Sequence, residues 1–382
     1  MRFRALIPVL SFLILCFLYS GSVLAENLNI SSQDSILKDE LSGLKKRSTY
    51  VFKSGAVYTG QIRLFKPHGY GQTLFVNGDT HVGEYSSGLR EGYGVYQFID
   101  GEKYQGEWSM NSQHGKGTYF FANGDRYTGN WDYDYQNGFG EFYYHNGDIY
   151  KGAWKKDIRH GKGFYVWNDG SYYSGEWKND KRDGIGTMVW SDSTEYSGAW
   201  VDGFREGKGI YTSKDYYFSG SWSKDRENGR GECRLGSGDS YSGEFRNGII
   251  SGFGIYIFAN SDTYKGYFKD GKAEGKGVFT WADGSKYDGD WKNNVFHGKG
   301  RMIWSNGDSY YGDWTEGVPN GQGSIKFADG NNYKGGFTDG QTDGEGIIQD
   351  ADGKVSEGTF SMGRRIGDFQ IKSQSGKVEK VD

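Results

Sequence analysis

Aromatic and glycine residues recur along this chain at a fixed spacing. Residues 150–154 read YKGAW, residues 173–177 read YSGEW, and related phrases follow one another along most of the chain. Fourteen copies begin at positions 58, 81, 104, 127, 150, 173, 196, 218, 241, 264, 287, 310, 333 and 356. Every step is 23 residues except the step of 22 from Tyr196 to Phe218. A constant period of this length is the signature of a repeat architecture.

The spacing of two within each copy predicts β-strands, because alternate side chains of a strand share one face. Counting the first aromatic residue as position 0, a copy reads Y-x-G-x-W, then polar residues, then G-x-G at positions 11 and 13 and aromatics at 15 and 17. In one copy this places Tyr150 and Trp154 on one face of the first strand. It places Tyr165 and Trp167 on the same face of the second strand. Each copy is therefore predicted to be a β-hairpin.

Consecutive hairpins are predicted to pair into one sheet, with neighbouring repeats about 10 Å apart because strands lie about 4.8 Å apart. We expect an all-β fold: a single-sheet antiparallel β-hairpin solenoid of about 14 repeats of 23 residues, elongated and twisted. Its aromatic face is expected to be structural. The predicted members of that face are Tyr104, Trp108, Tyr127, Trp131, Tyr150, Trp154, Trp167, Tyr173, Trp177, Trp190, Trp281, Tyr287, Trp291, Trp304, Tyr310 and Trp314.

Turn residues separate the predicted strands. Dipeptides such as Asn146-Gly147 at positions 19 and 20 predict two-residue hairpin turns, which need positive φ at both central residues. Position 7 is Gly, Asn or Asp in every copy but the first, which has Phe65, and it predicts a second left-handed site in the longer loop. Glycine at position 2 is expected to leave room for a ring from the next strand.

The N-terminal residues differ from the repeats. Arg2 and Arg4 precede an uncharged apolar run and small residues that end at Ala25, which is the layout of a secretory signal peptide. An uncleaved anchor is the alternative, because the run is long enough to cross a bilayer. We predict a signal peptide or anchor at 1–25, a polar linker at 26–47, a capping strand at 48–57, the repeat array at 58–370 and a C-terminal tail at 371–382. The expected location is the secretory route: secreted, periplasmic or lumenal, with membrane association if the N-terminal segment is retained.

Composition supports a folded, acidic protein. The chain has 382 residues, of which 64 are glycine and 17% are aromatic, and disordered chains contain few aromatics. Loss of Arg2 and Arg4 with the leader changes the formal charge from −4 to −6, which disfavours nucleic-acid binding. Cys16 would leave with the leader, so Cys233 has no partner for a disulfide within the mature chain.

The repeated phrase resembles a known family. YSGEWKNDKRDGIG at residues 173–186 and YDGDWKNNVFHGKG at residues 287–300 resemble the MORN repeat, the membrane occupation and recognition nexus motif. The resemblance implies an all-β scaffold, often beside membranes and sometimes dimeric, and some members of the family bind acidic phospholipids. A signal peptide is a departure from this mostly intracellular family.

Candidate catalytic and metal-binding residues point to structural roles. His68, His114, His160 and His297 occupy position 10, but copies two repeats apart lie roughly 20 Å apart, too far to share a metal ion. Carboxylates at position 3 recur in equivalent environments, whereas acid–base catalysis needs unlike ones. Cys233 is predicted to be a buried thiol. We expect no catalytic residue, no cofactor, no metal and no small-molecule substrate.

Basic residues at position 12 are predicted to form an intermittent row along one loop edge. A row of cations is suited to phosphate head groups or to a protein partner, although alternating acids favour plain solvated surface. The candidate contact residues are Lys116, Lys155, Lys156, Lys162, Lys181, Arg182, Lys208, Lys276 and Lys299, with Arg230 in the same row.

These observations favour a non-catalytic structural scaffold, exported or membrane-associated. Its extended β face is expected to dock a protein partner, a second copy of the chain or an acidic phospholipid surface. The alternative is a surface or cell-wall glycan-binding protein, because aromatic hairpin repeats form cages for sugars and quaternary amines. Such arrays carry adjacent aromatics in a W-Y-Y pattern, which is weak here.

Overall fold

The computed structural model describes residues 48–372 and 378–381. The chain divides into two compact units, residues 1–181 and 182–382, and each unit is described by itself. The described residues form thirty β-strands. No helix that is long and apolar enough to cross a membrane occurs among them. The predicted signal peptide and linker at residues 1–47 lie outside the described residues.

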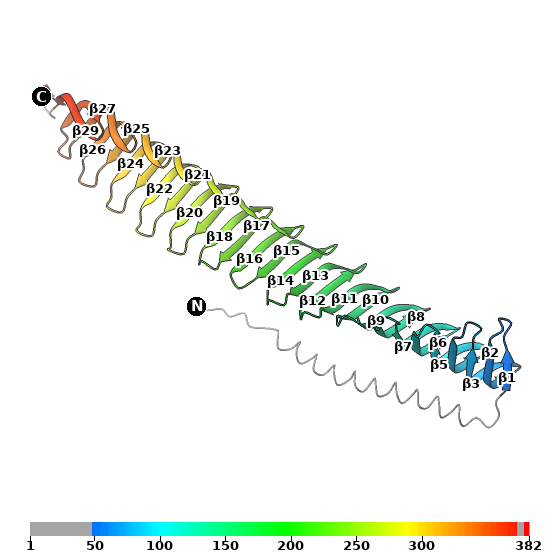
Figure 1. Cartoon of the computed structure of the whole chain (residues 1–382). Helices are drawn as coiled ribbons and strands as arrows, with labels where there is room; N and C mark the ends of the chain where they lie inside the picture. The colour runs from blue at the N-terminus through cyan, green and yellow to red at the C-terminus, as the bar shows by residue number, and fades with distance from the viewer. Residues whose placement is uncertain (1–47, 373–377, 382) are drawn as a thin grey trace. The chain divides into compact units, whose positions relative to one another are not determined.

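The first unit contains the strands β1 to β12, coloured blue to green in Figure 1. They are β1 Ser48–Val51, β2 Val57–Arg63, β3 Lys66–Leu74, β4 Thr80–Ser86, β5 Leu89–Gln97, β6 Lys103–Ser109, β7 Ser112–Phe120, β8 Arg126–Asp132, β9 Tyr135–Tyr143, β10 Ile149–Lys155, β11 Ile158–Val166 and β12 Tyr172–Lys178.

The second unit begins within β13 and continues to β30, green to red in Figure 1. Its strands are β13 Lys181–Val189, β14 Glu195–Val201, β15 Phe204–Thr212, β16 Tyr216–Ser223, β17 Arg226–Leu235, β18 Ser240–Arg246, β19 Ile249–Ile257, β20 Thr263–Lys269, β21 Lys272–Thr280, β22 Lys286–Lys292, β23 Val295–Ile303, β24 Ser309–Thr315, β25 Val318–Lys326, β26 Asn332–Thr338, β27 Gln341–Gln349, β28 Val355–Ser361, β29 Arg364–Lys372 and β30 Val378–Val381.

Within each unit, strands pair antiparallel with their neighbours in sequence and form an open sheet of one layer (Figure 1). The hairpin of β10 and β11 shows the register, with Tyr150 opposite Tyr165 and Gly152 opposite Gly163. β11 then pairs with β12 through the same two positions of the next repeat. The prediction of an all-β hairpin solenoid is confirmed.

The core is a ladder of aromatic rings on one face of the sheet, which we call the aromatic face. Tyr150 is 0% exposed and Trp154 is 6% exposed, although no second layer covers them. The rings of Tyr150 and Trp154 meet edge to face at 5.1 Å, and Tyr150 meets Trp177 of the next repeat at 5.5 Å. Edge-to-face contacts of this kind add stability beyond the area that the rings bury. Each repeat therefore covers the ring of its neighbour.

A facing pair of glycines makes room for each position-0 ring. A Cβ added to Gly163 would lie 2.4 Å from the Tyr150 hydroxyl oxygen, and one on Gly152 would lie 2.6 Å from the Cα of Gly163. The Tyr150 ring therefore lies flat across both glycines. We expected a ring from the next strand above Gly152, and that detail was wrong, because the ring belongs to the same strand.

A β-bulge follows the glycine pair in each hairpin. The register shifts between Gly152 and Trp154, and Gly161 on the opposite strand has φ of 67°. An extra residue in a left-handed conformation is the usual feature of a glycine bulge, which explains glycine at position 11. The Tyr150 hydroxyl donates a hydrogen bond of 3.0 Å to the carbonyl of Ala153, the residue within the register shift. The buried hydroxyl thereby satisfies a carbonyl at the irregularity.

The two kinds of turn are the reverse of the prediction. Lys156 and Asp157, at positions 6 and 7, have φ of 51° and 65°, so they form the two-residue turn with positive φ at both residues. In the loop that contains Asn146 and Gly147, only Gly147 has a positive φ, at 94°. Its N–H donates to the carbonyl of Tyr144 at 3.0 Å. The backbone N–H of Asp148 donates a hydrogen bond to the Asn146 side chain. This local bond explains why asparagine suits the position.

The ends of the array depart from the repeat. β1 pairs with β2, and β30 pairs with β29. In the last copy Ser356 replaces the position-0 tyrosine and Phe369 replaces the second glycine. The Phe369 ring is buried, packs edge to face on Phe360 at 5.4 Å and occupies the space above Gly358. A ring supplied from the opposite strand thus replaces the missing tyrosine.

The glycine pair can be tested with two alanine substitutions in the first unit. Gly163→Ala is expected to destabilise the protein by about 2 kcal/mol, because its Cβ would overlap the Tyr150 ring. Gly101→Ala is the matched control: Gly101 has φ of 98° and no atom within 4 Å of an added Cβ, so only the backbone cost of about 1 kcal/mol applies. Urea denaturation followed by tryptophan fluorescence measures both, and an equal or smaller loss for Gly163→Ala would contradict the packing argument.

Candidate functional site

The position-12 lysines lie inside strands, on the face opposite the aromatic rings, which we call the polar face. In the register, Lys162 lies opposite Glu176 and Lys276 lies opposite Asp290, at position 3 of the following repeat. The prediction of a row along a loop edge was wrong, because the strand continues through the bulge. The basic residues at position 12 are all exposed, and they are Lys116, Lys162, Lys208, Arg230, Lys276 and Lys299.

Several of these cations have partners on the polar face. The amine of Lys276 lies 2.7 Å from Asp290, and that of Lys299 lies 2.7 Å from Asp313. The hydrogen bond from Lys299 holds the pKa of Asp313 below its usual value. The amine of Lys208 donates to the Ser221 hydroxyl at 2.8 Å. The row is therefore a mixed surface in which neighbouring acids offset much of the positive charge.

The other four predicted contact residues do not join this row. Lys155 ends β10, Lys156 lies in the two-residue turn and Lys181 begins β13. Arg182 lies on the aromatic face, with its guanidinium carbon 4.0 Å from the centre of the Trp200 ring. The nine predicted residues consequently belong to three different places.

The predicted aromatic residues line the aromatic face of the sheet. The position-0 and position-4 rings in the prediction are 7% exposed or less where burial is recorded. The position-17 tryptophans are half-buried along one margin of this face. They are Trp167, Trp190, Trp281 and Trp304.

Arginine at position 9 covers the ring ladder, and the sequence analysis missed it. The guanidinium carbon of Arg159 lies 4.6 Å from the centre of the Trp177 ring, in the next repeat. Its Nε donates at 3.0 Å to Asp180, at position 7 of that repeat. Stacking on an indole face together with a carboxylate contact is favourable for a guanidinium. The signal was present, because Arg159 shares strand parity with Gly163 and Tyr165.

The same arrangement recurs in both units. Arginines at position 9 are Arg90 at 4.1 Å from Trp108 and, in the second unit, Arg182 at 4.0 Å from Trp200 and Arg205 at 4.3 Å from Trp222. The Nε of Arg205 donates to Asp225 at 3.2 Å, as that of Arg159 does to Asp180.

Carboxylates at position 21 join consecutive repeats and were also missed. The Tyr165 hydroxyl donates to Asp148 at 2.7 Å, and the backbone N–H of Asn168 donates to the other oxygen at 2.9 Å. Burial opposes ionisation of Asp148, but these hydrogen bonds hold its pKa below its ordinary value. An ionised carboxylate therefore links the loop of one repeat to the strand of the next.

A groove lies on the aromatic face of the first unit. Its volume is about 760 Å³, and it runs across consecutive repeats. Aromatic rings form its floor, and Asp134, Asp157 and Asp180 lie along one side with Arg159. The ring-bearing residues are Phe98, Tyr119, Phe121, Trp131, Phe142, Tyr144 and Trp154. Such a groove is suited to a chain segment rather than to one enclosed small molecule.

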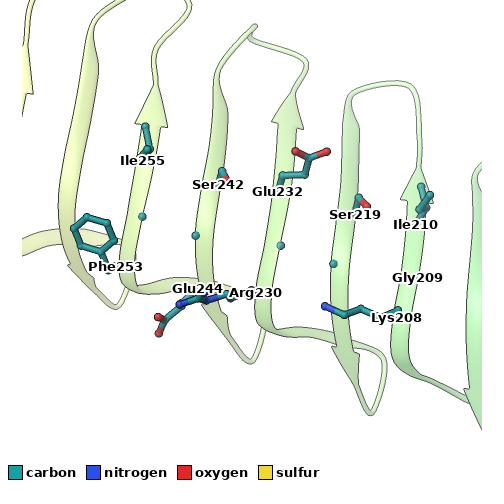
Figure 2. Close-up of a pocket in the computed structure, with 14 residues that line it drawn as sticks. Lys208, Gly209, Ile210, Ser219, Arg230, Glu232, Ser242, Glu244, Phe253 and Ile255 are labelled. Atoms are coloured by element: carbon teal, nitrogen blue, oxygen red, sulfur yellow. The ribbon is translucent and has the colours of Figure 1, made fainter. Parts of the chain in front are cut away.

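A second hollow, of about 750 Å³, lies on the polar face of the second unit. Figure 2 shows two rows of side chains: Lys208, Arg230 and Glu244 on one side, and Ser219 and Glu232 on the other. Glycines form the floor between them. The hollow mixes both charges and has no converging set of polar groups.

The histidine, cysteine and carboxylate candidates lie in separate surroundings. No group of three His, Cys, Asp or Glu side chains that could hold a metal ion occurs in residues 48–372 or 378–381. His114 lies 3.6 Å from Asp132. Cys233 is buried, and burial raises the pKa of its thiol, so its reactive thiolate is disfavoured. Glu107, a position-3 carboxylate, accepts the backbone N–H of Lys116 at the bulge, which is a structural role.

His81 occupies the buried place of a position-0 tyrosine. It is 0% exposed, its Nδ1 lies 2.8 Å from the Tyr85 hydroxyl, and its Nε2 has no hydrogen-bond partner among the described residues. The Tyr85 hydroxyl in turn lies 2.6 Å from the Thr73 hydroxyl. Burial, with a smaller contribution from Arg90, holds the pKa of His81 well below its ordinary value.

Comparisons with known proteins identify the repeat. Thirteen consecutive segments match the model of a family described as MORN repeat: residues 58–80, 81–103, 104–126, 127–149, 150–172, 173–195, 196–216, 218–240, 241–263, 264–286, 287–309, 310–332 and 333–355. The copy predicted from Ser356 lies beyond the match, although β28 and β29 pair as a hairpin. No curated protein matches the chain.

Similar solved structures are remote. The TCP domain of SAS-4 from Drosophila melanogaster, solved with a proline-rich motif of Ana2, is 15% identical with a TM-score of 0.29, over 40% of this chain and 83% of that chain. The TCP10 domain of CPAP from Danio rerio, solved with a peptide of STIL, is 10% identical with a TM-score of 0.20, over 76% of this chain and 94% of that chain. Such TM-scores support no argument about partners.

The buried histidine predicts acid sensitivity of the first unit. Its folded-state pKa lies below the unfolded value of about 6.5, so the unfolded chain binds a proton that the folded chain does not. Stability is therefore unaffected above about pH 7 and falls as the pH decreases through 6.5, by up to about 1.4 kcal/mol per pH unit.

His81→Tyr, which restores the residue found at Tyr58 and Tyr104, is expected to remove this loss. Urea denaturation of both proteins at pH 8 and pH 5 gives the difference in unfolding free energy at each pH. A difference that is the same at both pH values would contradict the assignment, because all other groups titrate in both proteins.

Proposed function

Because this chain belongs to the MORN repeat family, we propose that it is a non-catalytic interaction scaffold whose aromatic face docks a protein partner. The family is generally non-enzymatic. The observation that carries the proposal is the aromatic groove of about 760 Å³ in the first unit. Aromatic side chains supply much of the binding energy at protein interfaces. An open groove across several repeats suits the extended contact that repeat proteins make.

The polar face is a weaker candidate for docking. Lys276 and Lys299 already pair with carboxylates, so their positive charge is partly offset. An acidic phospholipid surface would need these cations to exchange their present partners. A glycan site would need a cage of polar groups around the rings, whereas the position-0 and position-4 rings are buried in the ladder.

The proposed role is on the secretory route, as residues 1–25 predict. Export would place the docking face among extracellular, periplasmic or lumenal partners, and retention of the segment would hold it at a membrane. Mass determination of the N-terminus of the protein from its own cells tests this. A mature chain that begins at Glu26 supports cleavage, and a chain that begins at Met1 in a soluble fraction contradicts export.

Site-specific photocrosslinking tests the docking face. A benzoylphenylalanine at Phe121, in the groove, is expected to crosslink a protein partner in the native cell extract. The same substitution at Phe139 is the matched control, because Phe139 is exposed on the polar face of the same unit. Mass spectrometry identifies the crosslinked protein, including a second copy of the chain. Crosslinks from Phe139 with none from Phe121 would reject the aromatic face as the docking surface.

Vesicle flotation tests the phospholipid alternative. The protein is expected to float equally with phosphatidylcholine vesicles and with vesicles that contain a third phosphatidylserine, at about 0.1 M salt. A preference for phosphatidylserine that disappears in the Lys116→Gln, Lys162→Gln double variant would instead assign lipid binding to the position-12 row.

A further inference from the structure

The arginine ladder of the aromatic face is interrupted in the first unit. Position 9 is arginine at Arg90 and Arg159, but the two repeats between them carry Gln113 and Gln136. Both glutamines are buried. Neither side chain carries a charge or reaches as far as a guanidinium, so the two repeats lack the cation that their neighbours supply.

The position-7 aspartate that binds the arginine elsewhere, as Asp180 binds Arg159, is also present beside each of the two glutamines. Asp134 accepts the backbone N–H of Gln113 at 2.7 Å, and Asp157 accepts that of Gln136 at 2.7 Å. Asp180 accepts the backbone N–H of Arg159 in the same way, at 3.0 Å, and also its Nε at 3.0 Å. Asp134 and Asp157 therefore make the same hydrogen bond to the position-9 backbone N–H as Asp180 does, but no arginine side chain binds them.

Asp134 and Asp157 are exposed and form no ion pair with a cationic side chain among residues 48–372 and 378–381. Arg90 acts on Asp134 electrostatically from a longer distance. The backbone N–H bonds engage one oxygen of each carboxylate. The second oxygen of each has no hydrogen-bond donor among the described residues, and both aspartates line the groove.

The groove lies where the arginines are missing. Its lining includes both glutamines, both carboxylates and two indoles, Trp131 and Trp154, which correspond to the ones that an arginine covers in other repeats. Each of these indoles is 6% exposed, so only its margin borders the groove. In the repeats that have the arginine, the guanidinium lies 4.0 to 4.6 Å from the corresponding indole. The groove therefore contains two sites that have the indole and the aspartate but lack the guanidinium that binds them in other repeats.

We propose that this groove binds an extended protein segment that carries two basic side chains, which take the two places left by the missing arginines. The proposal rests on the proposed function and specifies its partner. One basic side chain would bond Asp134 and contact the exposed margin of Trp131. The other would bond Asp157 and contact the exposed margin of Trp154. Arginine is preferred to lysine, because a planar guanidinium both stacks on a ring and donates two bonds to a carboxylate.

The repeat spacing sets the spacing of the two basic residues. Equivalent positions of consecutive repeats lie about 10 Å apart, since each repeat adds two strands. A segment in the polyproline II conformation advances about 3.1 Å per residue and has three residues per turn. Residues i and i+3 of such a segment therefore point to the same side, about 9 Å apart, and match the two sites. The residues between them would lie over the half-buried rings of Phe121 and Tyr144.

Charge complementarity supports the basic segment over an acidic one. The groove lining contains three aspartates and one arginine, so it is net negative. The single arginine, Arg159, is already engaged by Asp180. An anionic segment would be repelled, and a neutral apolar segment would leave the two carboxylates without a cation.

Fluorescence anisotropy with defined peptides tests the proposal on the full chain. The probe is a fluorescein-labelled ten-residue peptide with arginine at every third position and proline or alanine elsewhere. Its matched control has citrulline in place of each arginine, which keeps the shape and removes the charge. The arginine peptide is expected to bind at least about tenfold more tightly at about 0.1 M salt.

Two variants locate the binding. The double variant Gln113→Arg, Gln136→Arg supplies the missing guanidinium groups from the chain and is expected to weaken peptide binding at least about tenfold without lowering the melting temperature. Asp134→Asn with Asp157→Asn is expected to weaken it similarly. Thr342→Arg adds an arginine at position 9 of a repeat in the second unit and is expected to leave binding unchanged.

The outcomes separate this proposal from the docking function. Equal binding of the citrulline peptide, or full binding by the Gln113→Arg, Gln136→Arg variant, would overturn the basic-segment proposal. If Phe121 still crosslinks a partner in either case, docking at the aromatic face stands and only the partner chemistry is wrong. If Phe121 crosslinks nothing as well, both are wrong.

Discussion

One contact underlies the structure: an aromatic ring laid flat across two facing glycines. In the hairpin of β10 and β11 the pair Gly152 and Gly163 removes the side chains that would hold a ring off the sheet, so the Tyr150 ring lies directly on the backbone. Its hydroxyl satisfies the carbonyl at the bulge. A single-layered sheet has no second layer to bury apolar surface, and rings lying on backbone supply the burial that a second layer gives elsewhere. The position-0 ring, the glycines at positions 2 and 13 and the bulge therefore depend on one another and form one structural unit.

This structural unit determines which side chains remain exposed and able to contact a partner. The position-0 and position-4 rings are consumed by the ladder and contribute cohesion. In the proposed docking, contact with a partner falls to residues at positions 7, 9, 15 and 17 and to the margins of the position-4 rings. Where position 9 is arginine, the chain's own guanidinium covers the neighbouring indole, as Arg159 covers Trp177. Where position 9 is glutamine, the groove is lined by carboxylates that form no ion pair with a cationic side chain among the described residues. We therefore propose that specificity in this chain arises from variation at a few positions that border a mostly aromatic ladder.

Much of the fold could be predicted from the sequence, and the site could be predicted only in part. The alternation of Tyr150 and Trp154 specifies the face because a strand has a period of two. The turns were misassigned because Asn-Gly is a strong local signal, whereas the bulge and the register decide which loop is shortest. Arg182 was grouped with the lysines because charge suggests exposure, although its guanidinium rests on Trp200. Interactions between residues of different repeats, such as Arg159 with Asp180, leave no trace in a single period.

Strand pairing between sequence neighbours alone has a consequence for the history of the chain. Because each hairpin packs mainly on the one before and the one after, insertion or loss of a whole repeat changes contacts chiefly at the junction. The same locality keeps loop closure short during folding, so hairpins can form in order as the polypeptide emerges. Gene duplication can therefore lengthen such an array one module at a time without redesigning what is already there.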